Sequence, residues 1–225
     1  MKIEAVLFDM DGLMVDTESL STKALISSAK KQDYEMTKEE TLQVLGFTEA
    51  AIYKFWGNYF EDSHVDGKKL ADDHYDYIEE VLFTTGPDKM PNVEELLVYL
   101  KENNYKIAVA SSSNIDHIEN NMKKTRLRKY IDKIASGQEV LNGKPAPDVF
   151  LLAAERLGVK PENCLVLEDS KSGIKAGHAS GATVFMVPDM FKPDEECIEI
   201  ANRILKNLGE VINILEEEND KDFNR

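Results

Sequence analysis

The stretch that decides the fold is Phe8-Asp9-Met10-Asp11-Gly12, near the start of a chain of 225 residues. It ends the run Ile3-Glu4-Ala5-Val6-Leu7-Phe8, whose apolar and β-branched residues predict a buried strand. Two carboxylates this close to a buried strand are costly, because like charges repel and burial disfavours the ionised form. A cation between the two acids, or a different task for each, removes that cost. For this stretch alone, an ordinary acidic turn after a strand is the alternative.

Three further polar segments follow in the sequence. The first is Ser111-Ser112-Ser113-Asn114, after a second apolar run. The second is the proline-containing loop 143–148, which includes Lys144, and the third is Glu168-Asp169-Ser170, after another apolar run. Ligands bind outside the carboxyl ends of the strands in open α/β sheets. We therefore expect these segments to meet the first acidic pair in one crevice.

The order of the apolar runs predicts the architecture. Helical patterns separate the later runs, which is typical of βαβ units in a parallel sheet. Between the first and second runs, about seventy residues show helical periodicity and no strand pattern. We therefore predict an α/β fold: a Rossmann-like doubly wound parallel-sheet core, residues 1–15 plus 89–225 with the catalytic site, and an inserted α-helical cap, residues 16–88. The expected strands are residues 3–8, 106–110, 131–135, 164–167 and 182–187.

Charge and composition exclude several classes of protein. The net charge of −15 argues against nucleic acid as a partner, because phosphate backbones require basic surface. The cap alone has 16 acidic and 7 basic residues, so it is not a basic clamp. No apolar run reaches the roughly 18 residues of a membrane span, and the start of the chain lacks the layout of a signal peptide. Cys164 and Cys197 fit neither a zinc site nor a disulfide framework. We expect a cytoplasmic monomer or weak dimer that acts on a small molecule, without nucleic-acid or membrane partners.

Taken together, the four polar segments resemble the motifs of the haloacid dehalogenase-like phosphohydrolases. Residues 8–17 resemble the first motif, Ser111 the second, Lys144 the third, and Glu168-Asp169 the fourth. The resemblance covers almost the whole chain, and four motifs in order are far more specific than any single one. The loop 143–148 and the helical insert are further similar to the β-phosphoglucomutase-like branch.

This resemblance implies a two-step phosphoryl transfer. Asp9 is the expected nucleophile, because a carboxylate that attacks phosphorus forms an aspartyl-phosphate and divides one difficult displacement into two. Asp11 is the expected general acid and base, which protonates the leaving oxygen and later deprotonates water. Family dehalogenases generally lack an acid at this second position, so its presence favours phosphate chemistry.

The remaining site residues are assigned to binding. Lys144 is expected to act in catalysis and to hold the phosphate. Mg²⁺ is the expected cofactor, because it prefers oxygen ligands and keeps several waters. The expected substrate-binding residues are Gly12, Ser111, Ser112 and Lys144, and the expected metal ligands are Asp9, Asp169, Asp11 through its backbone carbonyl, and Glu168 directly or indirectly.

The predicted function is a Mg²⁺-dependent phosphomonoester hydrolase for a small metabolite, either a sugar phosphate or a nucleotide. A β-phosphoglucomutase-type mutase is the first alternative. In our register, however, Ser21 and Glu49 of the cap stand where mutases have a histidine and an arginine, and a glutamate would repel the distal phosphate of a bisphosphate. A phosphorelay receiver would place its nucleophile after the third strand. A non-catalytic phosphate-binding regulator would usually have lost one of the reactive residues.

The histidines are not expected to take part. His64, His74 and His117 are scattered without the spacing of metal ligands, so we predict that they lie on the surface.

Overall fold

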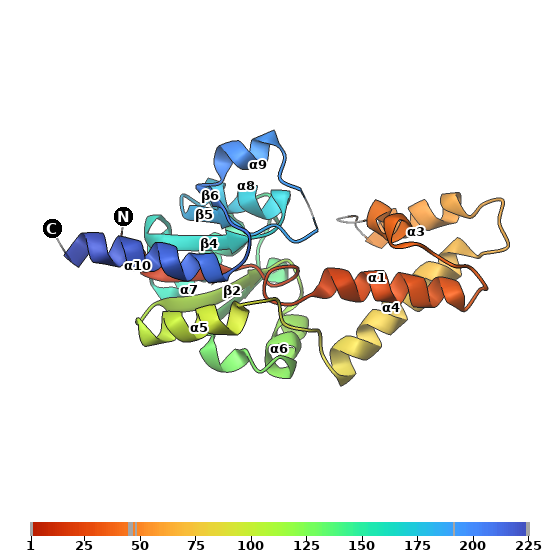
Figure 1. Cartoon of the computed structure of the whole chain (residues 1–225), viewed down its shortest axis with the longest axis horizontal. Coiled ribbons are helices and arrows are strands. Elements are labelled where there is room, and N and C mark those ends of the chain that lie inside the picture. The colour runs from red at the N-terminus through yellow and green to blue at the C-terminus, as the bar shows by residue number, and fades with distance from the viewer. Residues whose placement is uncertain (1, 45–46, 48, 191, 224–225) are drawn as a thin grey trace. The chain divides into compact units, whose positions relative to one another are not determined.

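The computed structural model describes residues 2–44, 47, 49–190 and 192–223 (Figure 1). The chain divides into two compact units, one formed by Met1–Val15 with Asp88–Arg225 and the other by Asp16–Pro87. The expected cap boundary at residue 88 differs by one residue from this division. We refer to the first unit as the core and to the second as the cap.

The core is built on a parallel sheet of six strands in the order β3-β2-β1-β4-β5-β6, as the predicted doubly wound fold requires. The five expected strands are present. The sequence did not indicate β6, a two-residue edge strand whose residues are both exposed and therefore form no apolar run. The bounds are β1 Ala5–Phe8, β2 Lys106–Ser111, β3 Lys133–Ser136, β4 Cys164–Glu168, β5 Thr183–Met186 and β6 Arg203–Ile204.

Helices cover both faces of the sheet because alternate strand residues point to opposite sides. Val6 and Phe8 pack in an apolar cluster with α5, α6 and α10, whereas Ala5 and Leu7 pack in a second cluster with α7 and α8. Figure 1 shows α5 and α10 near one another, and the two helices are in contact. The helices are α5 Val93–Glu102, α6 Ile115–Lys124, α7 Asp148–Leu157, α8 Lys171–Ala179, α9 Glu195–Ile200 and α10 Gly209–Phe223, with short 3₁₀ turns η2 Arg128–Tyr130, η3 Gly137–Glu139 and η4 Pro161–Asn163.

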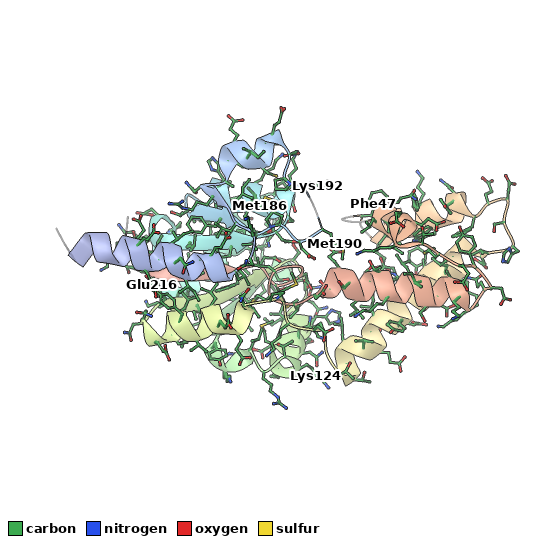
Figure 2. All side chains as sticks on the ribbon, in the orientation of Figure 1. Phe47, Lys124, Met186, Met190, Lys192 and Glu216 are labelled. Carbon is green, nitrogen blue, oxygen red and sulfur yellow. The ribbon has the colours of Figure 1, made fainter. Side chains whose placement is uncertain are left out.

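The side chains follow the same division between interior and surface. Figure 2 shows Met186 within the core, whereas Lys124 and Glu216 extend outward from their helices. Both cysteines are buried and free, and they pack as small apolar residues. None of the helices among the described residues is long and apolar enough to cross a membrane.

The cap is helical, with its own apolar cluster around Trp56, which is fully buried. Helix α4 packs against both α1 and α3. Asp16 caps α1 by accepting a hydrogen bond from the Ser19 N–H at 2.9 Å. The cap elements are α1 Thr17–Lys30, α2 Lys38–Thr41, η1 Leu42–Val44, α3 Glu49–Tyr59 and α4 Gly67–Thr84.

His74 corrects one expectation from the sequence. Its side chain is only 1 % exposed, and its Nε2 lies 2.9 Å from the Ser21 hydroxyl. The prediction of a surface histidine was therefore wrong. The reason is that His74 lies on the inner side of an amphipathic helix, one turn beyond the buried residues Leu70 and Ala71.

Candidate active site

The candidate site lies at the carboxyl ends of β1, β2 and β4, which are neighbours in the sheet. The register pairs Phe8 with both Val109 and Leu167, so the residues that follow these strands reach the same edge. Asp9 follows β1 directly, and its N–H donates to the Leu167 carbonyl at 3.0 Å. Strand β4 thus fixes the backbone of the predicted nucleophile.

Lys144 is buried against this edge and connects two carboxylates. Its ammonium group contacts Asp9 Oδ1, lies 2.7 Å from Glu168 Oε1 and donates to the Ala110 carbonyl at 3.2 Å. It also lies 4.8 Å from the ring centroid of Phe150. Three acceptors match the three N–H groups of an ammonium.

The electrostatics of the site favour a further positive charge. Burial, reinforced by Glu168 and Asp11 and opposed by Lys144, raises the pKa of Asp9 to about 8. Burial and the nearby carboxylates of Glu168 and Asp9 raise the pKa of Asp169 well above its usual range. Burial acts to lower the pKa of Lys144, but the charges of Asp9 and Glu168 outweigh it and raise that pKa. One lysine does not neutralise this group of acids.

Glu168 is fully buried, and both of its oxygens have protein partners. Oε1 accepts from Lys144, while Oε2 accepts from the Ser170 N–H and the Ser170 hydroxyl, each at 2.9 Å. A β-carbon at Gly173 would lie 1.7 Å from Oε1. These contacts favour an indirect role for Glu168 at the metal, as the residue that holds Lys144.

The donor set fits a magnesium ion. A β-carbon at Gly12 would lie 2.4 Å from Asp169 Oδ2, so the absence of a side chain lets this carboxylate approach the loop that contains Asp11. Gly12 has a φ of +77°, which glycine adopts without strain. Within the described part of the chain, no three His, Cys, Asp or Glu side chains form a metal cluster. The expected set differs from such a cluster because it combines the side chains of Asp9 and Asp169 with a backbone carbonyl, and water completes Mg²⁺ sites.

Asp11 is held by the serine run 111–113, which begins at the last residue of β2. Ser113 donates to Asp11 Oδ2 at 3.0 Å, and Ser111 lies 3.4 Å from the same oxygen. Ser112 is exposed, so the structure does not bring its hydroxyl to the acidic group. The sequence had indicated Ser111 and Ser112 but not Ser113. Asn114 caps α6 by accepting from the His117 N–H at 2.9 Å.

Comparison with known proteins identifies the family. The sequence model for haloacid dehalogenase-like hydrolases matches residues 6–187, which is most of the chain. The chain belongs to this family. It is 31% identical to the phosphorylated carbohydrates phosphatase of Thermotoga maritima, over 96% of this chain and 99% of that protein. It is 34% identical to the probable pseudouridine-5'-phosphatase of Drosophila melanogaster, over 93% of this chain and 91% of that protein.

Solved structures agree with this assignment. A putative β-phosphoglucomutase from Thermotoga maritima matches with a TM-score of 0.82 and 29% identity, over 96% of this chain and 99% of that one. A family hydrolase from Deinococcus radiodurans R1 with bound phosphate and sodium matches with a TM-score of 0.83 and 26% identity, over 96% of both chains. The family and its named phosphatases make this haloacid dehalogenase-like protein a phosphatase.

Proposed function

We propose that this phosphatase is a Mg²⁺-dependent phosphomonoester hydrolase that forms an aspartyl-phosphate on Asp9 and acts on a small phosphorylated sugar or nucleotide. The observation that supports this most is Lys144, buried between Asp9 and Glu168 at the edge of the sheet that also bears Asp11. Removing a lysine and two acids from water costs desolvation free energy. Buried charged groups of this kind cluster at functional sites.

In the first step, a carboxylate oxygen of Asp9 attacks phosphorus and the bond from phosphorus to the leaving oxygen breaks. Asp11 donates its proton to that oxygen, and the alcohol departs. In the second step, water attacks the aspartyl-phosphate, Asp11 takes the proton from the water, and the bond from phosphorus to Asp9 breaks. Inorganic phosphate leaves, and both acids return to their initial state.

Lys144 contributes a fixed positive charge next to the transferring group, which stabilises the negative charge on phosphate in the transition state. Asp9, Asp169 and the Asp11 carbonyl would hold Mg²⁺, with Glu168 in an indirect role through Lys144. When bound, the ion offsets the repulsion between two anions and stabilises the charge that develops on the phosphate oxygens.

The substrate class is inferred from relatives and from charge. The Thermotoga maritima relative is named for phosphorylated carbohydrates, and the Drosophila relative for pseudouridine 5'-phosphate. Glu49 begins α3 and is exposed, and Ser21 contacts His74, so neither supplies the positive charge that a distal phosphate needs. Leu45, Gly46 and Thr48 of the same cap loop lie outside the described residues. A monophosphate therefore fits better than a bisphosphate.

Phosphate release from a panel of monoesters, with Mg²⁺ and with EDTA, tests the proposal. The panel contains hexose and pentose phosphates, nucleoside monophosphates, and β-glucose 1-phosphate with its bisphosphate activator. We expect Mg²⁺-dependent release that Asp9→Asn abolishes, because an amide is a poor nucleophile. Conversion of β-glucose 1-phosphate to glucose 6-phosphate without release would instead establish the mutase alternative.

A further inference from the structure

Ser113 makes a contact that neither the sequence motifs nor the proposed chemistry explains. It is the third serine of the run after β2, and it donates a hydrogen bond of 3.0 Å to Oδ2 of Asp11. The Ser111 hydroxyl lies 3.4 Å from the same oxygen and also accepts from the Ser113 N–H at 3.0 Å. Two hydroxyl groups thus meet one oxygen of the predicted acid.

The backbone of Ser113 is fixed by the neighbouring strand. Its carbonyl accepts a hydrogen bond of 2.7 Å from the hydroxyl of Ser136, a residue that ends β3 and is fully buried. Ser136 is itself held, because its N–H donates to Glu139 Oε2 at 3.0 Å. A β-carbon at Gly137 would lie 3.0 Å from the Ser112 α-carbon, so the turn after β3 packs closely on the serine run.

The hydroxyl of Ser113 therefore ties Oδ2 of Asp11 to a stretch of backbone that Ser136 holds in place. A carboxyl group held through one of its oxygens no longer rotates freely about its Cβ–Cγ bond. The contact thus restricts the orientation of the Asp11 carboxyl group.

We propose that Ser113 is the positioning residue of the general acid: its hydroxyl holds Oδ2 of Asp11 and so keeps the carboxyl group in the orientation that proton transfer requires. This inference rests on the proposed function. In the step that it serves, Asp9 forms a bond to phosphorus, the bond to the leaving oxygen breaks, and the proton of the Asp11 carboxyl group moves to that oxygen. Ser113 itself neither gains nor loses a proton.

If Ser113 positions the general acid, the loss of rate on removing its hydroxyl depends on the leaving group. An alkoxide, as in a sugar phosphate, needs a proton when it departs, whereas p-nitrophenolate departs without one. General acid catalysis contributes roughly 10²–10⁴-fold to a rate, and part of that depends on position. We compare kcat/KM, which covers the steps up to departure of the alcohol, for glycerol phosphate or a hexose phosphate and for p-nitrophenyl phosphate.

We expect Ser113→Ala to lower kcat/KM for the alkyl ester by about 10-fold or more and for p-nitrophenyl phosphate by less than about 3-fold. Ser113→Thr keeps the hydroxyl and should recover most of the activity toward the alkyl ester. Ser136→Ala removes the support of the Ser113 carbonyl together with the cap of η3. It should also lower kcat/KM more for the alkyl ester than for p-nitrophenyl phosphate, but to a smaller degree than Ser113→Ala. Ser180→Ala removes a hydroxyl at the far end of α8 and should affect the two esters equally.

Equal losses with both esters in Ser113→Ala would overturn the proposal, since a phosphate-binding or purely structural role predicts that result. No loss with either ester would overturn it as well. Failure of the proposed function has a different signature: the wild-type protein would release phosphate from neither ester in the presence of Mg²⁺.

Discussion

Lys144 is the residue on which the electrostatics of the site depend. It is the buried cation between Asp9 and Glu168, with a side chain that is only 5 % exposed. We expect Lys144→Ala to lower kcat by a factor on the order of 10², comparable to the loss of one oriented electrostatic partner. Initial rates of phosphate release measure this.

Lys101→Ala provides the matched control, because Lys101 pairs with Asp132 at 2.7 Å on the surface of the same unit. Exposed ion pairs contribute little to the stability of a protein, and Lys101 is not among the residues of the candidate site. This variant should therefore keep the rate of the wild type. A loss below about 3-fold in Lys144→Ala would contradict the role assigned to that lysine.

We expect His74 to make the stability of the cap sensitive to acid. Burial lowers the pKa of His74 to about 4, from about 6.5 in an unfolded chain. Above pH 6.5 the imidazole is neutral in both states. As the pH falls from 6.5 toward 4, the unfolded chain binds a proton that the folded cap does not, and the folded state loses up to about 3 kcal/mol. Urea unfolding at pH 7 and pH 5 should show a smaller loss of stability in His74→Gln than in the wild type.

Identical losses in the two proteins would show that His74 does not cause the acid sensitivity. The comparison of variant with wild type cancels contributions from other groups, because both chains share them.

The residues that could be predicted from sequence are those next to a strand end. Asp9 and Glu168 were identifiable because an acid at the end of an apolar run is unusual, and the parallel sheet then brings them together. Ser113 could not be distinguished from Ser112 by the same reasoning. Which of two adjacent hydroxyl groups reaches Asp11 depends on the turn after β2, and the distant residues Ser136 and Gly137 fix that turn.

Helix α8 shows at the scale of an element how close packing serves the site. Gly173 lies in its first turn, where a β-carbon would overlap the carboxylate of Glu168. We expect Gly173→Ala to displace Glu168 and, with it, Lys144, and so to reduce kcat by at least about 10-fold. Steady-state kinetics and circular dichroism distinguish loss of activity from loss of fold.

Gly57 is the corresponding glycine in a helix without such a contact, since a β-carbon there would meet nothing within 4 Å. Gly57→Ala should leave kcat unchanged and raise stability by about 0.5–1 kcal/mol, the usual gain for alanine in a helix interior. Equal kinetics in the two variants would refute the packing argument.

Strands could be predicted from the sequence where each one corresponds to a single apolar run. β1, β2 and β4 are buried along most of their length, and each appeared in the sequence as a continuous apolar segment. β6 could not be found in this way, because it pairs by backbone hydrogen bonds at the edge and buries neither of its two residues.

At the scale of the whole molecule, the core and the cap have separate apolar clusters. Trp56, the only tryptophan of the chain, is buried in the cap cluster. Tryptophan fluorescence therefore reports unfolding of the cap, while circular dichroism reports both units. Leu70→Ala creates a cavity in the cap. We expect it to lower the free energy of unfolding measured by fluorescence by about 2–5 kcal/mol. The part of the circular dichroism transition that comes from the core should not change.

Leu165→Ala is the matched substitution in the core, where Leu165 is as fully buried as Leu70 is in the cap. Leu165→Ala should lower the free energy of unfolding of the core, measured by circular dichroism, and leave the fluorescence transition of the cap unchanged. If either variant moved both transitions equally, the two units would unfold as one cooperative body.

The contact between Lys144 and Asp9 joins residues that lie 135 positions apart in the chain. With Asp169, the site requires polypeptide from both sides of the cap and from most of the core. During synthesis on a ribosome, the first strand therefore leaves the exit tunnel long before its partners. We expect nascent chains that stop short of residue 169 to lack enzymatic activity, so phosphatase activity should first appear after about three quarters of the 225 residues have been made.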